Sequence, residues 1–306
     1  MSDIKLFQFS GQSVTEVQST SMALEKSLQT LIEKNLEIFL GVRFIASEYS
    51  TGTEHGGRID TLGLDENRCP VIIEYKLSSN MNVINQGLYY LDWLVNHRGD
   101  FEILVMKKFD KEEAQKVEWS SPRLVCIAAG FSKYDDHAIK QMNHNIELIR
   151  YINFENGLML LEQTNAVSSR SVATPVSSAI KTTGYKYRQT TVSEYLEKAD
   201  KKLTSLYESV RTYLNNLGDD VQEKTLSYYI AFKRIRNFAC IEIRPQDKKL
   251  LVFLKVSPDT IELVQGFTRD VRSIGHYGTG DLEVTIRSTE DLDKAKTYFL
   301  HSYENA

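Results

Sequence analysis

The chain has 306 residues, 42% of them hydrophobic and 25% charged, and its formal net charge at pH 7 is −4. This acidic balance disfavours a protein that coats nucleic acid through a generally basic surface, but it is compatible with an enzyme whose site holds a cation. No stretch approaches the ~20 apolar residues that a membrane helix needs. The first residues lack the basic-then-apolar layout of a secretory signal. We therefore expect a cytoplasmic protein of about two domains, with no membrane partner.

The first half of the chain mixes helical and extended patterns. Apolar residues near helical spacing predict helices at 22–40, 82–97, 110–118 and 134–143. Short apolar runs predict strands at 42–49, 58–64, 70–77, 101–106, 123–129, 146–153 and 157–163. This order predicts an α/β domain over residues 1–163, in which helices flank a mixed central sheet.

The second half of the chain begins with a change in composition. Residues 164–190 are rich in Ser, Thr and Ala, hold four basic residues and no acidic one, and have no hydrophobic period. This composition predicts a basic interdomain linker. Beyond it, residues 191–306 predict a small α+β domain with a helix at 191–215, three strands at 238–245, 250–258 and 281–288, and a last helix near 289–302.

Two groups of metal-binding residue types are better explained without a metal. Cys69, Cys126 and Cys240 lie too far apart for a zinc or redox motif, so we expect buried thiols in a reducing compartment. His137 and His144 are seven residues apart on a short polar helix, where a solvated helix face is the better explanation.

The strand predicted at 70–77 carries charged side chains within an apolar run, VIIEYK. Because side chains alternate along a strand, Glu74 and Lys76 share one face. If the turn before this strand is centred on Asn67, Asp60 lies directly opposite Glu74, with Cβ atoms about 5 Å apart. Two carboxylates at that spacing repel each other unless a cation lies between them, and oxygen ligands suit Mg²⁺ or Mn²⁺. Lys76 would then orient or deprotonate a water and stabilise charge on a phosphate.

Two alternatives remain open on spacing alone. Glu74 and Lys76 fit a solvated strand face equally well, and Asp60 with Lys76 fits an ordinary surface ion pair. A register slip of one residue would also move Asp60 to the other face of the sheet.

Four segments between about residues 22 and 95 resemble the PD-(D/E)XK nuclease superfamily, most closely the NucS-type endonucleases. In order, they are LEKSLQTLIEKNLEIFLG, GGRIDTLG, VIIEYK and NQGLYYL. The resemblance implies a restriction-endonuclease-like core, with a mixed sheet flanked by helices, and metal-dependent hydrolysis of phosphodiester bonds with DNA as the expected partner. The alternative is a non-catalytic nucleic-acid-binding or regulatory protein that retains this fold.

The resemblance also implies roles for individual residues. Asp60 and Glu74 are similar to the metal ligands, together with the backbone carbonyl of Tyr75. Lys76 is similar to the catalytic lysine. Glu25, at the start of the first helix, is similar to the outer acid that holds a metal-bound water, and Glu33 on the same helix ranks second.

Three further residues are candidates for contact with the nucleic acid. Gln86 and Tyr90 resemble the Gln-x-x-x-Tyr pattern of the superfamily, and would brace the site or touch the nucleic-acid backbone. A helix face packed over the sheet is the alternative, and it fits Tyr90 better than Gln86. Arg58 is a candidate phosphate contact, and a plain surface arginine explains it equally well.

The resemblance has limits. The N-terminal half of the NucS-type enzymes, which supports dimerisation and binding, has no evident counterpart in residues 1–21, although a homodimer stays an expectation. Residues beyond about 100 have no clear counterpart either, so the preferred DNA structure does not transfer. The C-terminal stretch resembles a small conserved domain of unknown function that often follows nuclease-like domains.

Two patterns in the C-terminal half have competing explanations. A basic and aromatic cluster, formed by Phe232, Lys233, Arg234, Arg236 and Phe238, fits a stacking platform for single strands or a charged edge with core aromatics. The glycine-rich residues 276–284 lack the Lys-Ser/Thr ending of a phosphate-binding loop, which favours a tight turn into a strand.

Overall fold

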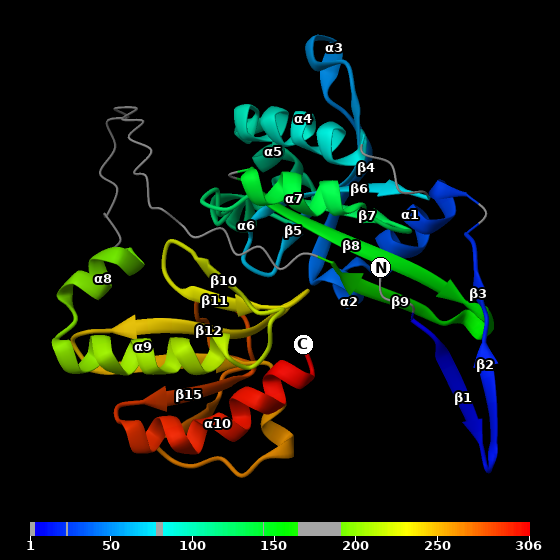
Figure 1. Cartoon of the computed structure of the whole chain (residues 1–306). Helices are drawn as coiled ribbons and strands as arrows, with labels where there is room; N and C mark the ends of the chain where they lie inside the picture. The colour runs from blue at the N-terminus through cyan, green and yellow to red at the C-terminus, as the bar shows by residue number, and fades with distance from the viewer. Residues whose placement is uncertain (1–3, 23, 78–81, 143, 165–190) are drawn as a thin grey trace. The chain divides into compact units, whose positions relative to one another are not determined.

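The computed structural model describes residues 4–22, 24–77, 82–142, 144–164 and 191–306 (Figure 1). The chain divides into two compact units, an N-terminal one that ends at Val167 and a C-terminal one that begins at Ser168. The linker predicted at 164–190 lies outside the described residues except for Thr164. Over the described ranges, no helix combines the length and the apolar character that crossing a membrane requires.

The N-terminal unit is built on a seven-stranded mixed sheet, with strand order β3-β8-β7-β6-β5-β4 and β9 paired to β8. Its strands are β3 (Ser19–Thr20), β4 (Val42–Ser50), β5 (Arg58–Asp65), β6 (Pro70–Lys76), β7 (Arg123–Ala128), β8 (Asn145–Phe154) and β9 (Met159–Gln163). Its helices are α1 (Glu25–Lys34), α2 (Leu36–Leu40), α3 (Gly52–His55), α4 (Asn82–Asn96), α5 (Arg98–Lys108), α6 (Lys111–Gln115) and α7 (Lys133–Gln141). Strands β4, β5 and β6 are antiparallel, while β6, β7 and β8 are parallel. The predicted α/β fold with a mixed central sheet is confirmed.

The register between β5 and β6 is the one that the turn predicted. Thr61 lies opposite Ile73 and Leu62 lies opposite Ile72. The turn itself is closed by Asp65, whose carboxylate accepts the backbone N–H of Asn67 at 2.8 Å. A turn fixed in this way leaves a single register, and this register places Asp60 and Glu74 on the same face of the sheet.

The two faces of the sheet have different covers. The apolar side chains that share the face of Glu74 pack against helices α4 and α5. This cluster includes Leu62, Leu64, Ile72, Val83, Leu91, Leu94, Phe101 and Val105. Helix α1 lies over the other face, where its polar side chains reach Ser47 and Thr61. The candidate site lies where β5 begins and β6 ends. Tyr90 of α4 contacts Arg58 at this end, and Glu25 of α1 contacts Lys76.

The strand predicted at 101–106 is wrong, because these residues lie within helix α5. Phe101 and Val105 are the buried residues of this helix, four positions apart, as a helix requires. A six-residue run with five apolar residues is too short for its period to separate a strand from a buried helix. The parallel neighbour of β6 is β7, which corresponds to the strand predicted at 123–129.

Two more differences concern the beginning of the chain. The single helix predicted at 22–40 is interrupted at Asn35, whose backbone has a φ of −129°. Residues 1–21 carry an unpredicted hairpin of β1 (Leu6–Ser10) and β2 (Ser13–Val17), which extends from the unit as a separate two-stranded sheet (Figure 1). Strands β1 and β2 are short and largely exposed, so their sequence has no hydrophobic period from which they could be predicted.

The C-terminal unit has a six-stranded antiparallel sheet with the order β10-β11-β12-β13-β15-β14. Its strands are β10 (Gln222–Thr225), β11 (Ile230–Lys233), β12 (Asn237–Arg244), β13 (Lys249–Leu254), β14 (Thr268–Asp270) and β15 (Leu282–Ile286). Its helices are α8 (Val192–Lys198), α9 (Lys201–Asn215) and α10 (Thr289–Glu304). The predicted helix at 191–215 is therefore two helices, because the Asp200 side chain caps α9 by accepting the Leu203 N–H at 2.8 Å.

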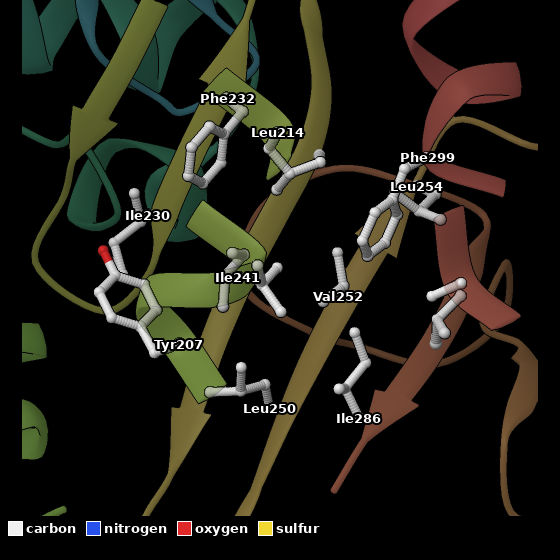
Figure 2. Close-up of a cluster of buried hydrophobic side chains, with 14 of the residues drawn as sticks. Tyr207, Leu214, Ile230, Phe232, Ile241, Leu250, Val252, Leu254, Ile286 and Phe299 are labelled. Atoms are coloured by element: carbon white, nitrogen blue, oxygen red, sulfur yellow. The ribbon is translucent and has the colours of Figure 1, made fainter. Parts of the chain in front are cut away.

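The core of this unit lies between one face of its sheet and helices α9 and α10. Figure 2 shows the side chains of Tyr207, Leu214 and Phe299 gathered with those of the strands. Phe232 and Phe238 belong to the same core and are 0% and 1% exposed, so bases cannot stack on them. Lys233 is buried too, at 2% exposed, and of this cluster only Arg234 and Arg236 are partly exposed, so the charged edge consists of these two arginines over core aromatics. The glycine-rich residues at 276–284 lead into β15, as expected for a turn.

The three cysteines are buried and form no disulfide, as the sequence predicted.

Candidate metal site

Asp60 and Glu74 face each other at one end of the β5–β6 pair. The backbone N–H of Asp60 donates to Glu74 Oε1 at 3.2 Å, and the backbone N–H of Tyr75 donates to Asp60 Oδ2 at 3.1 Å. Each carboxylate thus holds the main chain of the opposite strand. The two contacts tie β5 to β6 beside both carboxylates.

Glu74 is fully buried, and its second oxygen has no hydrogen-bond donor among the described residues. Burial, followed by the negative charge of Asp60, raises the pKa of Glu74 from 4.5 to about 9. Burial also raises the pKa of Asp60, although the hydrogen bond from Tyr75 opposes this shift. A buried carboxylate in this state requires either a proton or a cation.

Lys76 projects from the same strand as Glu74, and its Nζ lies 2.9 Å from Glu25 Oε1. Burial lowers the pKa of Lys76, but the hydrogen bond and the charge of Glu25 outweigh this effect, so the pKa is raised overall. Lys76 is therefore an ammonium ion near neutral pH. This charge state favours stabilisation of a negative phosphate over deprotonation of a water.

The residues present suit a cation that keeps several waters. The described part of the chain contains no cluster of three or more His, Cys, Asp or Glu side chains with metal-binding geometry, and His137 and His144 form none. Magnesium is commonly bound through only one or two carboxylates and completes its shell with water and substrate oxygens. The second oxygen of Glu74, which has no donor among the described residues and lies beside Asp60, fits that requirement, and Tyr75 follows Glu74 on the same strand.

Sequence reasoning missed Gln29, which lies beside the site. Glu25, Gln29 and Glu33 recur every four residues on α1, and the amide of Gln29 donates to the backbone oxygen of Asp60 at 2.8 Å. Glu33 does not approach the carboxylate of Asp60; it accepts a hydrogen bond from Thr61 Oγ1 at 2.6 Å. The spacing of four was the available signal, and it identifies all three residues as one helix face.

Tyr90 and Gln86 lie over the start of β5. Tyr90 is buried, and its hydroxyl accepts the backbone N–H of Arg58 at 3.1 Å and lies 3.4 Å from Gln86 Nε2. A Cβ atom at Gly57 would lie 2.5 Å from the Tyr90 ring, so this close packing requires glycine. These contacts favour bracing of the strand by Tyr90. Arg58 is exposed, with its guanidinium 3.5 Å from Glu48.

A second buried charge cluster lies at the opposite end of the same strands and serves packing. Arg123 bonds Asp65 at 2.9 Å and Glu147 at 2.8 Å, and the three side chains are nearly inaccessible to solvent. Here each carboxylate has a cationic partner, in contrast to Glu74. The fixed guanidinium supplies the positive charge that a metal would supply elsewhere.

Fold and site together define a two-unit α/β protein, in which paired carboxylates and a lysine meet at one end of a mixed sheet. The chain is 30% identical over 298 residues to a protein of Haemophilus influenzae (strain Rd) described as uncharacterized, with 95% of this chain and 96% of that protein covered. The chain belongs to the family of this Haemophilus influenzae protein. Residues 192–305 match the model of a domain of unknown function, DUF5655, as the sequence resemblance predicted.

Solved structures with partial similarity include an EndoMS–dsDNA complex, with a TM-score of 0.30, 18% identity, and coverage of 43% of this chain and 47% of that one. A repair endonuclease from Pyrococcus abyssi has a TM-score of 0.29 and 13% identity, with 48% and 65% covered. SfsA of Pyrococcus furiosus in complex with Ca²⁺ has a TM-score of 0.25 and 14% identity, with 49% and 75% covered. The chain spans less than two thirds of the first two structures. TM-scores of 0.30 or less do not establish an activity for this chain.

Proposed function

We propose that the protein is a metal-dependent nuclease that hydrolyses phosphodiester bonds in DNA. The observation that supports this most strongly is the buried second oxygen of Glu74, which has no hydrogen-bond donor within the described ranges, in a carboxyl group that lies beside Asp60 and feels the charge of Lys76. A structural carboxylate in such a position would have a fixed cationic partner, as Asp65 does. An acid pair without such a partner fits a site that binds an exchangeable divalent cation.

Each residue of the proposed site would have its own role in metal binding or in stabilising the phosphate. Asp60 and Glu74 would hold Mg²⁺ or Mn²⁺, with the carbonyl of Tyr75 as a third ligand. The bound ion supplies Lewis-acid activation of water and of the phosphodiester. The ammonium of Lys76 stabilises the negative charge that develops on the phosphate. Glu25 holds that ammonium in place at 2.9 Å and keeps it protonated.

The substrate would approach from the side of Arg58, which is exposed, and of Asp60 and Lys76, which are partly exposed. Arg58 precedes Asp60 by two residues and is exposed, so it is suited to contact a phosphate. Gln86 is half-buried and contacts the Tyr90 hydroxyl, which in turn accepts the backbone N–H of Arg58, so Gln86 lies near this end of β5. Assembly as a homodimer is part of the proposal, and light scattering on the purified protein tests it.

The direct test is a cleavage assay with single-stranded, duplex and branched DNA in Mg²⁺ or Mn²⁺. The variants are Asp60→Ala and Lys76→Ala, and Asp92→Ala serves as the control because it removes an exposed acid of the same unit. We expect cleavage by the wild type and the control, with a loss of at least about 100-fold in the two site variants. DNA binding without cleavage by the wild type would instead support the non-catalytic alternative. Equal cleavage by wild type and both site variants would exclude this site.

A further inference from the structure

Gln29 connects helix α1 to the two strands beneath it. The side chain is 4% exposed, and its Nε2 donates to the backbone oxygen of Asp60 at 2.8 Å, to Glu33 Oε1 at 3.0 Å and to Ser47 Oγ at 3.2 Å. Its Oε1 accepts from Lys26 Nζ at 3.1 Å. Every polar atom of this amide is therefore engaged, as expected of a buried polar group.

The hydrogen bonds around Gln29 continue through Glu33 and Thr61 to the hydroxyl of Tyr75. The Thr61 hydroxyl donates to Glu33 Oε1 at 2.6 Å, and the Tyr75 hydroxyl lies 3.3 Å from Thr61 Oγ1. Side chains alternate along a strand, so Thr61 and Tyr75 point away from the face that carries Asp60 and Glu74. Two of the three proposed ligand residues are thus held from the reverse face of the sheet.

Gln29 occupies a position where packing alone favours an apolar residue. Its neighbours Leu28 and Ile32 are the other buried residues of α1, and both are fully buried. An amide in such a layer is costly unless its hydrogen bonds are made. The hydrogen bond from Gln29 reaches the backbone oxygen of Asp60 from helix α1. The hydrogen bonds of Asp60 with Glu74 and Tyr75, in contrast, lie within the β5–β6 pair.

We propose that Gln29 is a positioning residue of the metal site: its amide fixes the main chain of Asp60, and thereby the separation of the Asp60 and Glu74 carboxylates. This inference rests on the proposed function, because it assumes that those carboxylates bind a divalent cation. Gln29 itself does not reach the cation. Its removal keeps every proposed ligand group in the chain, but it lets the main chain of Asp60 move relative to α1 and so changes the separation of the two carboxylates.

The test is isothermal titration of MnCl₂ into the full-length protein. Gln29→Met keeps the length and approximate volume of the side chain but removes its hydrogen bonds, and Gln29→Asn keeps an amide that is one methylene too short. Leu28→Val is the matched control, because it loosens the same helix without touching the polar layer. We expect Mn²⁺ affinity to fall about tenfold in both Gln29 variants at unchanged stoichiometry, as for the loss of one buried hydrogen bond. We expect a change below about twofold in Leu28→Val.

Stoichiometry separates positioning from unfolding, because misfolded protein lowers the number of sites while a displaced ligand lowers the affinity. Wild-type affinity in both Gln29 variants, or an equal loss in Leu28→Val, would overturn the role of Gln29 and leave the proposed function intact. If the wild type shows no saturable Mn²⁺ binding, or if Glu74→Gln binds as well as the wild type, the metal site itself fails and the proposed function fails with it.

Discussion

Replacing Glu74 by glutamine should change how the stability of the metal-free protein depends on pH. The side chain keeps its shape, but it no longer ionises. In the wild type the pKa of Glu74 is raised from 4.5 to about 9 by burial and by the charge of Asp60. A group with a raised pKa in the folded state stabilises the fold fully below its unfolded pKa, and this contribution is lost as the pH rises through the folded pKa. The metal-free wild type should therefore lose stability from pH 4.5 upwards.

The size of this effect follows from the same pKa values. Each pKa unit corresponds to about 1.4 kcal/mol, and Glu74 is fully buried, so solvent screening is small. Between pH 5 and pH 7 the wild type should lose on the order of 2–3 kcal/mol relative to Glu74→Gln. Any constant cost of placing an amide in this site cancels, because only the change with pH is compared. Titrating groups that do not interact with Glu74 are common to both proteins and also cancel, whereas Asp60 is coupled to Glu74 and contributes to the measured difference.

The assay is urea unfolding in EDTA at pH 5 and pH 7, followed by tryptophan fluorescence. Both tryptophans of the chain, Trp93 and Trp119, lie in the N-terminal unit, so the signal reports the unit that carries the site. A difference between the two proteins that stays constant within about 0.5 kcal/mol over this pH range would refute the reasoning, since it would mean that Glu74 titrates normally.

Three further outcomes follow from the contacts. At pH 7, Mn²⁺ binding should release about one proton from Glu74, measured by calorimetry in buffers of different ionisation enthalpy; zero release would contradict the raised pKa. Arg123→Met should destabilise the N-terminal unit by about 3–5 kcal/mol in urea because it removes the guanidinium that contacts two buried carboxylates, without changing Mn²⁺ affinity. Gly57→Ala should cost about 1–3 kcal/mol through its clash with Tyr90, and an unchanged urea midpoint would count against that packing.

The sequence predicts best the part of the site that depends on a turn and on the alternation of side chains along two neighbouring strands. The turn at Asn67 sets the register of β5 and β6, and alternation along the strands then brings Asp60 and Glu74 to one face. The family resemblance assigned Glu25 as the outer acid of the site, and the structure places its carboxylate 2.9 Å from the Lys76 ammonium, a contact that was not predicted.

The parts that sequence reasoning missed depend on tertiary packing. Gln29 reads as one polar position of an amphipathic helix, and only the approach of α1 to β4 and β5 buries its amide. Residues 101–106 were predicted as a strand because six residues are too few to show a decisive period, and the burial of Phe101 and Val105, four positions apart, becomes visible only in the folded unit. The division of 191–215 into α8 and α9 depends on one capping contact of Asp200.

The central claim is that Asp60 and Glu74 share a divalent cation, and anomalous diffraction from a crystal soaked in MnCl₂ tests it most directly. We expect one anomalous peak at coordination distance, about 2 Å, from a carboxylate oxygen of each residue, and no such peak in Glu74→Gln. A saturated crystal with no peak between the two carboxylates, or with an equal peak in the variant, would contradict the account.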